Sequence, residues 1–162
     1  MLYPAIDFSK FNGERQASLF DRPYFVSLNR YERKKDIKLA IEAFALLPKR
    51  LIEENYLVIA GGFDDRVAEN VEHYKELQDT ALAKGIAGSV RFMRNITDGE
   101  RVNLLTNSVA VLYTPENEHF GIVPCEAMYS GVPVIAANCG GPMESVADGS
   151  SGFLVEGGAG NA

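Results

Sequence analysis

Two glutamates, Glu118 and Glu126, stand with seven residues between them in the segment EHFGIVPCE. Pro124 favours the first position of a helix, where its missing N–H would be unpaired in any case. Gly131 and Pro133 then end that helix, as a C-terminal glycine and a following proline commonly do. The pattern predicts that Glu126 lies in the first helical turn and Glu118 on the loop before it.

The backbone N–H groups near Gly121 and Ile122 are therefore expected at a helix N-terminus, where a phosphate is favoured. An acid, an anion site and a second acid, in that order, would suit a sugar joined to a nucleoside through a diphosphate. Taken alone, each piece is ordinary. A glutamate such as Glu126 also stabilises a first helical turn through capping and the helix dipole, and Glu118 could be a plain loop acid.

A basic run, RYERKK, follows an expected strand at residues 24–29, with four basic residues among six. It stands immediately before an expected helix N-terminus, where cations are disfavoured and a bound anion would compensate. Arginine offers a fork of donors to phosphate oxygens, and lysine offers a mobile charge. We predict phosphate contact for Arg30 and Lys35, and a solvated turn for Arg33 and Lys34.

Gly61 and Gly62 end a second expected strand, and glycine permits a backbone to approach a ligand closely. Any tight turn could also use such a pair. The chain has no Gly-x-x-x-x-Gly-Lys-Ser/Thr phosphate loop, and no Gly-x-Gly-x-x-Gly follows its first strand. The second absence argues against a nicotinamide or flavin enzyme.

Short β-rich runs alternate with helical periods along almost the whole chain. The expected strands are 24–29, 56–60, 89–92, 109–113, 134–137 and 152–155. The expected helices are 37–47 with Asp36 as N-cap, 67–84, a helix opened by the capping box Thr97–Glu100, 124–131, and 142–147. This alternation predicts an α/β fold, a doubly wound parallel sheet of Rossmann-like type. Ligands of such sheets bind at the carboxyl ends of the strands, where the strand order reverses.

Length and charge narrow the possible functions. A chain of 162 residues is about one domain, and its formal net charge of −6 argues against a general binder of nucleic acid or anionic membranes. No apolar run approaches the roughly 18 residues that span a bilayer, so we expect the chain itself to be soluble.

Cys125 and Cys139 fit no metal or redox spacing. We expect no metal, because there is no Asp-x-Asp element and the basic residues can replace a metal at a diphosphate; we also expect no cofactor.

Together these segments resemble the C-terminal, donor-binding domain of the GT-B fold in retaining family 4 glycosyltransferases. The matching segments are NRYERKKD, VIAGG, EHFGIVPCEAMYSGVPVIAANCGGPMESV and GFLVE. More narrowly, LYPAIDFSKF and SLNRYERKKDIKLAIEAF look like the α-1,3/1,6-mannosyltransferase branch. That branch uses GDP-mannose to extend the dolichol-linked oligosaccharide of N-glycan assembly, on the cytosolic side of the endoplasmic reticulum membrane.

The resemblance implies roles for three catalytic residues. Arg30 and Lys35 would neutralise the donor diphosphate and stabilise the GDP leaving group. Glu118 would accept hydrogen bonds from mannose hydroxyls. The family retains the anomeric configuration by front-face attack without an established enzyme nucleophile. Neither glutamate therefore receives the acid or nucleophile role that paired carboxylates play in glycosidases.

The resemblance also implies a donor-binding set. The amides of Phe120 and Gly121 would assist at the sugar, and those of Ile122 and Val123 would touch the phosphates. Glu126 would accept hydrogen bonds from both ribose hydroxyls. The full predicted donor-binding set is Gly61, Gly62, Phe120, Gly121, Ile122, Val123 and Glu126.

The resemblance further implies how the chain is organised. Residues 1–162 are expected to form a single nucleotide-sugar-binding domain with a linker-like lead-in at 1–22. The N-terminal acceptor domain and the final helix of the parent enzyme are expected to be absent. We therefore expect this chain to bind the donor but to perform no transfer. The lipid-linked oligosaccharide acceptor would be engaged through the missing N-terminal domain.

Three alternatives stay open. One is a family 4 glycosyltransferase that uses a UDP-sugar, because no residue distinguishes guanine from uracil. A second is a sugar-nucleotide epimerase of GT-B type. The third is a noncatalytic binding module, although the intact set of Arg30, Lys35, Glu118 and Glu126 argues against it.

Overall fold

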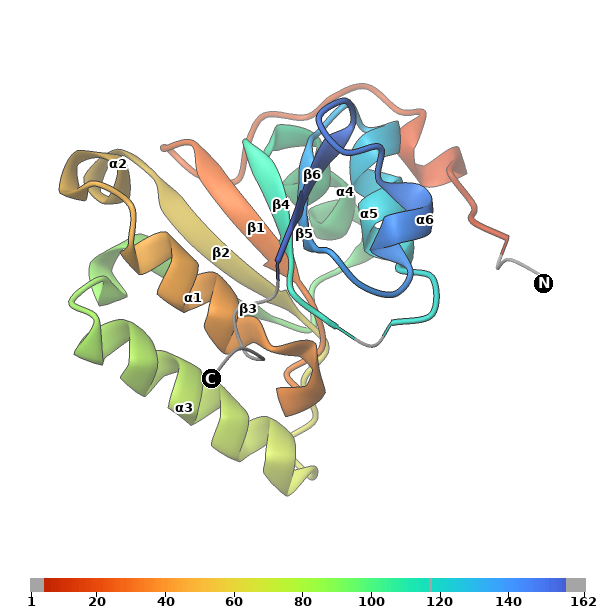
Figure 1. The fold of residues 1–162 in the computed structure, drawn as a ribbon. Helices are drawn as coiled ribbons and strands as arrows, with labels where there is room; N and C mark the ends of the chain where they lie inside the picture. Colours follow the sequence, from red (N-terminus) through yellow and green to blue (C-terminus); the bar gives the residue numbers. More distant parts are fainter. Residues whose placement is uncertain (1–4, 117, 157–162) are drawn as a thin grey trace.

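Six parallel strands form one sheet, in the order β3-β2-β1-β4-β5-β6 (Figure 1). The computed structural model describes residues 5–116 and 118–156, so the outer limits of the expected domain and lead-in, 1–4 and 157–162, lie outside it. The strands are β1 (Tyr24–Leu28), β2 (Tyr56–Gly61), β3 (Val90–Arg94), β4 (Ala110–Tyr113), β5 (Val134–Ala137) and β6 (Gly152–Val155). Each neighbouring pair runs parallel, which confirms the expected doubly wound α/β fold.

Helices cover both faces of this sheet, and α1 packs beside α3 on one of them (Figure 1). The helices are α1 (Ile37–Ala45), α2 (Lys49–Glu54), α3 (Ala68–Ala83), α4 (Asp98–Asn107), α5 (Ile122–Tyr129) and α6 (Pro142–Ser145). Short 3₁₀ turns are η1 (Ser9–Phe11), η2 (Arg33–Lys35) and η3 (Ala87–Ser89). From the middle of the sheet, β1, β2 and β3 follow one another toward one edge, and β4, β5 and β6 follow one another toward the other edge. The order therefore reverses between β1 and β4.

Strand β2 shows why the sheet is buried on both faces. Its residues alternate between two apolar clusters: Val58 and Ala60 pack in the cluster with α4 and α5, while Leu57 and Ile59 pack in the cluster with α1 and α3. A strand covered on both sides needs an unbroken apolar run, which is what β2 has. Each fully buried aliphatic side chain contributes about 1.5–3 kcal/mol relative to an exposed one.

Helix α5 begins two residues earlier than expected. Gly121 adopts a left-handed φ of 73°, and the helix starts directly after it at Ile122. Pro124 is thus the third helical residue and Glu126 lies in the second turn, so both expected positions are wrong. Proline is tolerated there because the first four helical N–H groups have no intrahelical acceptor.

The end of α5 confirms the role expected for glycine. Gly131 adopts a φ of 74° and donates its N–H to the carbonyl of Met128. The N–H of Val132 reaches back to the carbonyl of Ala127. These two bonds form a Schellman motif, which satisfies carbonyls that the helix end would otherwise leave open.

The other helix starts give mixed outcomes. The capping box of Thr97 and Glu100 is present with both of its hydrogen bonds. Asp36 does occupy the N-cap position of α1, but with a φ of 45° and no side-chain hydrogen bond, so the expected capping contact is wrong. Helix α2 was not expected. It follows Pro48, and six residues are too few for a periodic pattern to emerge.

The lead-in lies along α4 and α5 and is held there by specific contacts. Phe8 stacks on Tyr129 with ring centroids 4.2 Å apart, and Phe11 meets the same ring edge-on. Asn103 of α4 donates a hydrogen bond to the carbonyl of Ala17. The described part of the lead-in is therefore packed against the domain.

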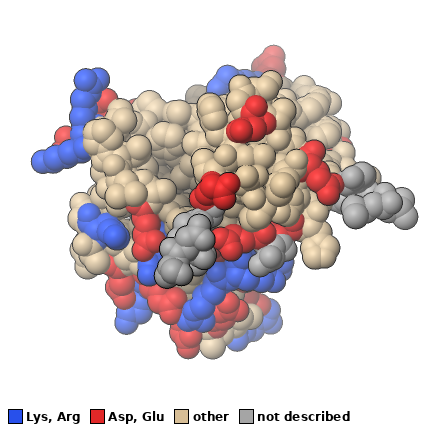
Figure 2. Space-filling view, in the orientation of Figure 1, with Lys and Arg blue, Asp and Glu red and all other residues tan. Residues whose placement is uncertain are grey.

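Charges of both signs are interspersed over the lower part of the face in Figure 2, where Figure 1 places α1 and α3. The region over β6 and α6 carries few charges. Within the described ranges, no helix combines the length and the apolar character that crossing a bilayer requires.

Candidate functional site

A cleft of about 360 Å³ opens at the carboxyl ends of β1, β2 and β4, beside the start of α5. This is the point where the strand order reverses, the usual ligand site of doubly wound sheets. Nine of the ten predicted site residues line it: Arg30, Lys35, Gly61, Gly62, Glu118, Phe120, Gly121, Ile122 and Val123. The structure thus brings together three segments that are far apart in the sequence.

Lys35 and Glu118 form an ion pair across this cleft. The Lys35 side chain is only 11% exposed, and a buried ammonium group requires such a counterion. The backbone of the same residue is also fixed, because its carbonyl accepts a hydrogen bond of 2.7 Å from the hydroxyl of Thr114. The basic turn after β1 is therefore joined directly to the segment after β4.

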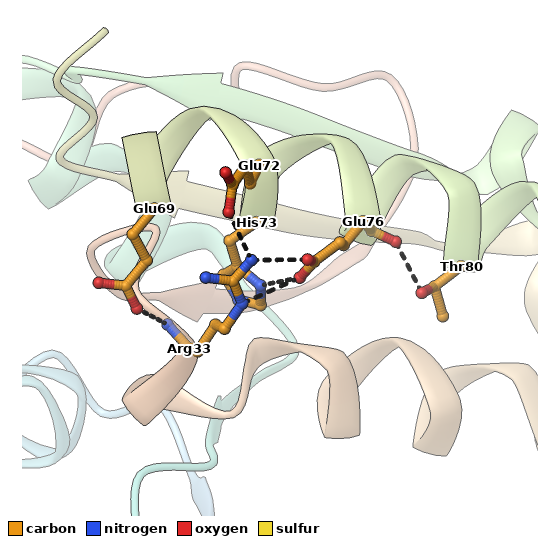
Figure 3. A network of polar contacts seen from close by, with 6 residues as sticks. All are labelled: Arg33, Glu69, Glu72, His73, Glu76 and Thr80. Atoms are coloured by element: carbon orange, nitrogen blue, oxygen red, sulfur yellow. Dashed lines mark hydrogen bonds and ion pairs between the residues drawn. The ribbon is translucent and has the colours of Figure 1, made fainter. Parts of the chain in front are cut away.

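The turn η2 is anchored on its other side by Arg33 (Figure 3). Its guanidinium group donates to Glu76 at 2.7 Å and to Glu72 at 3.1 Å, and its backbone N–H donates to Glu69 at 3.0 Å. The hydrogen bonds from Arg33, followed by one from His73, lower the pKa of the Glu76 carboxyl. We expected a solvated base; the structure shows an exposed arginine that also ties η2 to α3.

Arg30 lies at the open side of the cleft. Its guanidinium group is 3.3 Å from a carboxylate oxygen of Glu32, and its side chain is 65% exposed. Lys34 contacts the other oxygen of Glu32 at 3.0 Å and points largely to solvent. Arg30 itself is thus largely exposed, whereas its partner Glu32 is only 17% exposed.

Glu126 lies in a neighbouring hollow of about 230 Å³ and does not line the main cleft. Ile122 and Arg101 line both spaces and so connect them. The Glu126 side chain is 12% exposed and accepts hydrogen bonds from Arg101 on its Oε2, at 2.5 Å and 3.2 Å. Its Oε1 has no hydrogen-bond partner in the described part of the chain and can accept from a ligand.

Arg101 is a charged residue of the cleft that sequence reasoning missed, and Tyr113 is another lining residue absent from the predicted set. Arg101 lies in the first turn of α4, where a cation is electrostatically disfavoured unless an anion stands nearby. The capping box of Thr97 and Glu100 fixes where that turn begins. The same argument that selected the basic run could therefore have selected Arg101, but its partner on α5 depends on how the two helices pack.

The first glycine of the pair at the end of β2 is explained by the protein's own packing. A Cβ atom at Gly61 would lie 1.9 Å from the carbonyl oxygen of Asn29, closer than any side chain can approach. A Cβ atom at Gly62 would lie 3.3 Å from the Cγ of Arg30. Both glycines line the cleft, yet chain-to-chain contact alone already requires Gly61.

The start of α5 presents open hydrogen-bond donors. Within the described residues, the amide groups of Gly121, Ile122 and Val123 have no acceptor. Amides at a helix N-terminus, together with the helix dipole, favour an anion. A phosphate in the cleft would satisfy donors that the chain itself leaves open.

Size alone does not select this cleft. A hollow of about 410 Å³ lies between the lead-in and α4, but none of its lining residues belongs to the sheet. Across residues 5–116 and 118–156, no group of three or more histidines, cysteines or acids is placed to hold a metal ion.

The comparisons agree with the fold. Residues 10–162 match the family described as "Glycosyl transferases group 1". The human Alpha-1,3/1,6-mannosyltransferase ALG2 is 44% identical over 96% of this chain and 40% of its own length. The chain thus spans about 40% of the length of the curated relatives it matches.

Two solved structures have the same fold. Anabaena Alr3699/HepE, in complex with UDP and glucose, superposes with a TM-score of 0.75 and 28% identity, covering 85% of this chain and 35% of that one. The C-terminal domain of a group 1 family protein (LpcC) from Francisella tularensis gives a TM-score of 0.72 and 26% identity, covering 85% and 70% of the two chains.

Proposed function

Because this chain belongs to the glycosyl transferase group 1 family, we propose that its cleft binds the nucleotide-sugar donor of a retaining mannosyltransferase, and that the donor is GDP-mannose. Relatives named α-1,3/1,6-mannosyltransferases, 42–44% identical over nearly the whole chain, support the mannosyl group. In the complete enzyme the acceptor would be a lipid-linked oligosaccharide, at the cytosolic side of the endoplasmic reticulum membrane.

One observation carries the proposal: two basic side chains and a row of open amides face the same cleft. Arg30 and Lys35 approach from the turn after β1, and the amides of Gly121 and Ile122 approach from the start of α5. All of these groups donate hydrogen bonds or carry positive charge. A diphosphate, which only accepts hydrogen bonds and is negatively charged, complements them.

The two glutamates would bind the ends of the donor. Glu118 lines the cleft beside Lys35 and would accept hydrogen bonds from mannose hydroxyls. Glu126, in the adjoining hollow, keeps its Oε1 open and would accept from the ribose hydroxyls. The hollow continues from the cleft past Ile122, so a nucleoside diphosphate sugar could span both spaces.

The chemistry then follows from charge. When the bond between the mannose C1 and the diphosphate oxygen breaks, negative charge grows on the leaving group. Arg30 and Lys35 would stabilise that charge in the transition state. The acceptor hydroxyl oxygen would bond to C1 on the same face, and its proton would pass to the departing phosphate. We assign donor binding to this chain and transfer to the complete enzyme.

The test is calorimetric titration of the chain with GDP-mannose, GDP and UDP-glucose. We expect the guanosine ligands to bind selectively and Lys35→Met to abolish that binding. Lys49→Met, which removes an 89% exposed lysine from α2, is the matched control and should bind as the unaltered chain does. A folded chain that binds none of the three ligands would contradict the proposal.

A UDP-sugar donor is the second candidate, because the related HepE structure holds UDP and glucose. The same titration separates the two. If the chain prefers UDP-glucose to GDP-mannose, and Lys35→Met abolishes that binding, the cleft is still the donor site but the donor is a UDP-sugar.

A further inference from the structure

We infer that the hydroxyl group of Tyr113 is a further donor of the site and hydrogen-bonds a phosphate oxygen of the bound nucleoside diphosphate. The inference rests on the proposed function and deepens it. Tyr113 is the last residue of β4, its side chain lines the cleft, and the residue is only 4% exposed.

The position of the phenol follows from its neighbours. A Cβ atom at Gly121 would lie 3.1 Å from the Tyr113 hydroxyl oxygen, so that oxygen lies against the backbone where α5 begins. The open amides of Gly121 and Ile122 belong to the same segment. An anion that accepts from these amides would also lie beside the phenol.

The Tyr113 hydroxyl has no hydrogen-bond partner within the described residues, which is unusual for a buried tyrosine. Of the other buried tyrosines, Tyr24 and Tyr31 are satisfied by backbone carbonyls, whereas the Tyr56 hydroxyl, like that of Tyr113, has no partner within the described residues. Tyr24 donates to the region of Asn103 and Leu104, and Tyr31 donates to Ile59 or Met93. Among these four tyrosines, Tyr113 is the one that lines the cleft, where a ligand can serve as acceptor.

The surroundings also keep this hydroxyl protonated. Burial raises the pKa of Tyr113, and the nearby Glu118 carboxylate raises it further. A protonated phenol is a donor at neutral pH, like the amides and the lysine around it. Because the hydroxyl lies against the open amides where α5 begins, which favour an anion, we assign its acceptor as a phosphate oxygen.

The test compares Tyr113→Phe with Tyr24→Phe by titration with GDP and GDP-mannose and by thermal unfolding. A hydrogen bond to a charged group contributes about 1.5–3 kcal/mol, so Tyr113→Phe should weaken both ligands roughly 10- to 100-fold. Its melting temperature should not fall, because no internal hydrogen bond is lost. Tyr24→Phe should show the reverse pattern, with a lower melting temperature and unchanged affinity.

Other outcomes overturn the inference. Equal affinity of Tyr113→Phe and the unaltered chain would exclude the contact, and a loss for GDP-mannose alone would place the hydroxyl on the sugar. A lower melting temperature for Tyr113→Phe would mean that the hydroxyl has a structural partner. Failure of the unaltered chain to bind would instead contradict the proposed function itself.

Discussion

At the scale of single residues, the site is an arrangement of opposite charges that are already paired before any ligand arrives. Lys35 faces Glu118, and Arg101 faces Glu126. Each pair leaves some hydrogen-bonding capacity open, because a carboxylate oxygen can accept more than one bond. Removal of one partner therefore leaves the other as a poorly solvated charge, which is more costly than removal of both.

Arg101→Met tests this reasoning. Glu126 would stay largely buried without its cation, and we expect the free energy of unfolding to fall by about 1–3 kcal/mol. Urea unfolding at neutral pH measures the change. The double variant Arg101→Met, Glu126→Gln should recover part of the loss, because no charge is then left unpaired.

Lys10→Met is the control, because it breaks an ion pair with Asp98 that is exposed on both sides. Exposed pairs contribute little, since water screens both charges. Equal losses for Arg101→Met and Lys10→Met would show that the Glu126 pair has no special role.

The residues of the site were largely predictable, and their partners were not. The presence of Arg30, Lys35 and Glu118 in the cleft follows from a basic run and an acid that each come after a strand in an alternating chain. That Lys35 would meet Glu118, 83 residues away, depends on which strands become neighbours. Arg101 was missed for the same reason, because its ion pair with Glu126 depends on how α4 packs against α5.

At the scale of elements, the turn η2 holds Lys35 in place, and α3 holds η2 through Arg33. Four polar contacts from one arginine to three glutamates make this connection. Since the contacts depend on ionised carboxylates, the anchor should weaken in acid.

The pH dependence follows from the lowered pKa of Glu76. A carboxyl group whose pKa is lower in the folded state stabilises the fold above its ordinary value of 4.5, and this contribution is lost as the pH falls through the folded pKa. We expect Glu76→Gln to be less stable than the unaltered chain at pH 7 and to converge with it in acid below that folded pKa. Urea unfolding between pH 7 and pH 3 measures the difference.

Glu54→Gln is the matched control, because it removes an exposed pair with Arg50 inside α2, away from the cleft. Its profile should follow that of the unaltered chain. A difference between Glu76→Gln and the unaltered chain that does not shrink in acid would contradict the electrostatic account of the anchor.

The elements themselves show where local pattern suffices. Strand β2 was predicted within one residue, because burial on both faces demands an unbroken apolar run. The start of α5 was misplaced, since a left-handed Gly121 can begin a helix without any side-chain cap. Asp36 was expected to cap α1 through its carboxylate, but its backbone is left-handed and its side chain makes no capping hydrogen bond.

At the scale of the whole molecule, the cleft lies where two halves of the sheet meet. Residues that line the cleft come from the β1–β3 half and from the β4–β6 half, so a ligand bound there would contact both. A ligand that binds only the folded protein stabilises it by mass action.

Saturation with GDP should therefore raise the melting temperature. At 100 times its dissociation constant, a ligand adds about 2.7 kcal/mol to the free energy of unfolding. For a domain of this size, each kcal/mol corresponds to roughly 2–4 °C, so a shift of several degrees is expected. Differential scanning calorimetry with and without GDP measures it. The Lys35→Met chain should show no shift, and the proposal fails if the unaltered chain shows none either.

The doubly wound sheet was predictable from the alternation of strands and helices, but the order of its strands was not. Right-handed crossovers allow the chain to build outward on either side of β1. The strand order is fixed by the pairing of β1 with β4, in which Phe25 pairs with Ala110 and Val26 with Val111. No local sequence pattern predicts this long-range pairing.

The reversal of strand order has a consequence for how this protein could be divided. Residues 24–94 form one side of the sheet and residues 110–155 form the other. A cut in the segment between β3 and α4 would leave Arg30 and Lys35 on one piece and Glu118 and Glu126 on the other. Neither piece would hold a complete set of ligand contacts. We therefore expect the donor to bind only when both pieces are present and assembled.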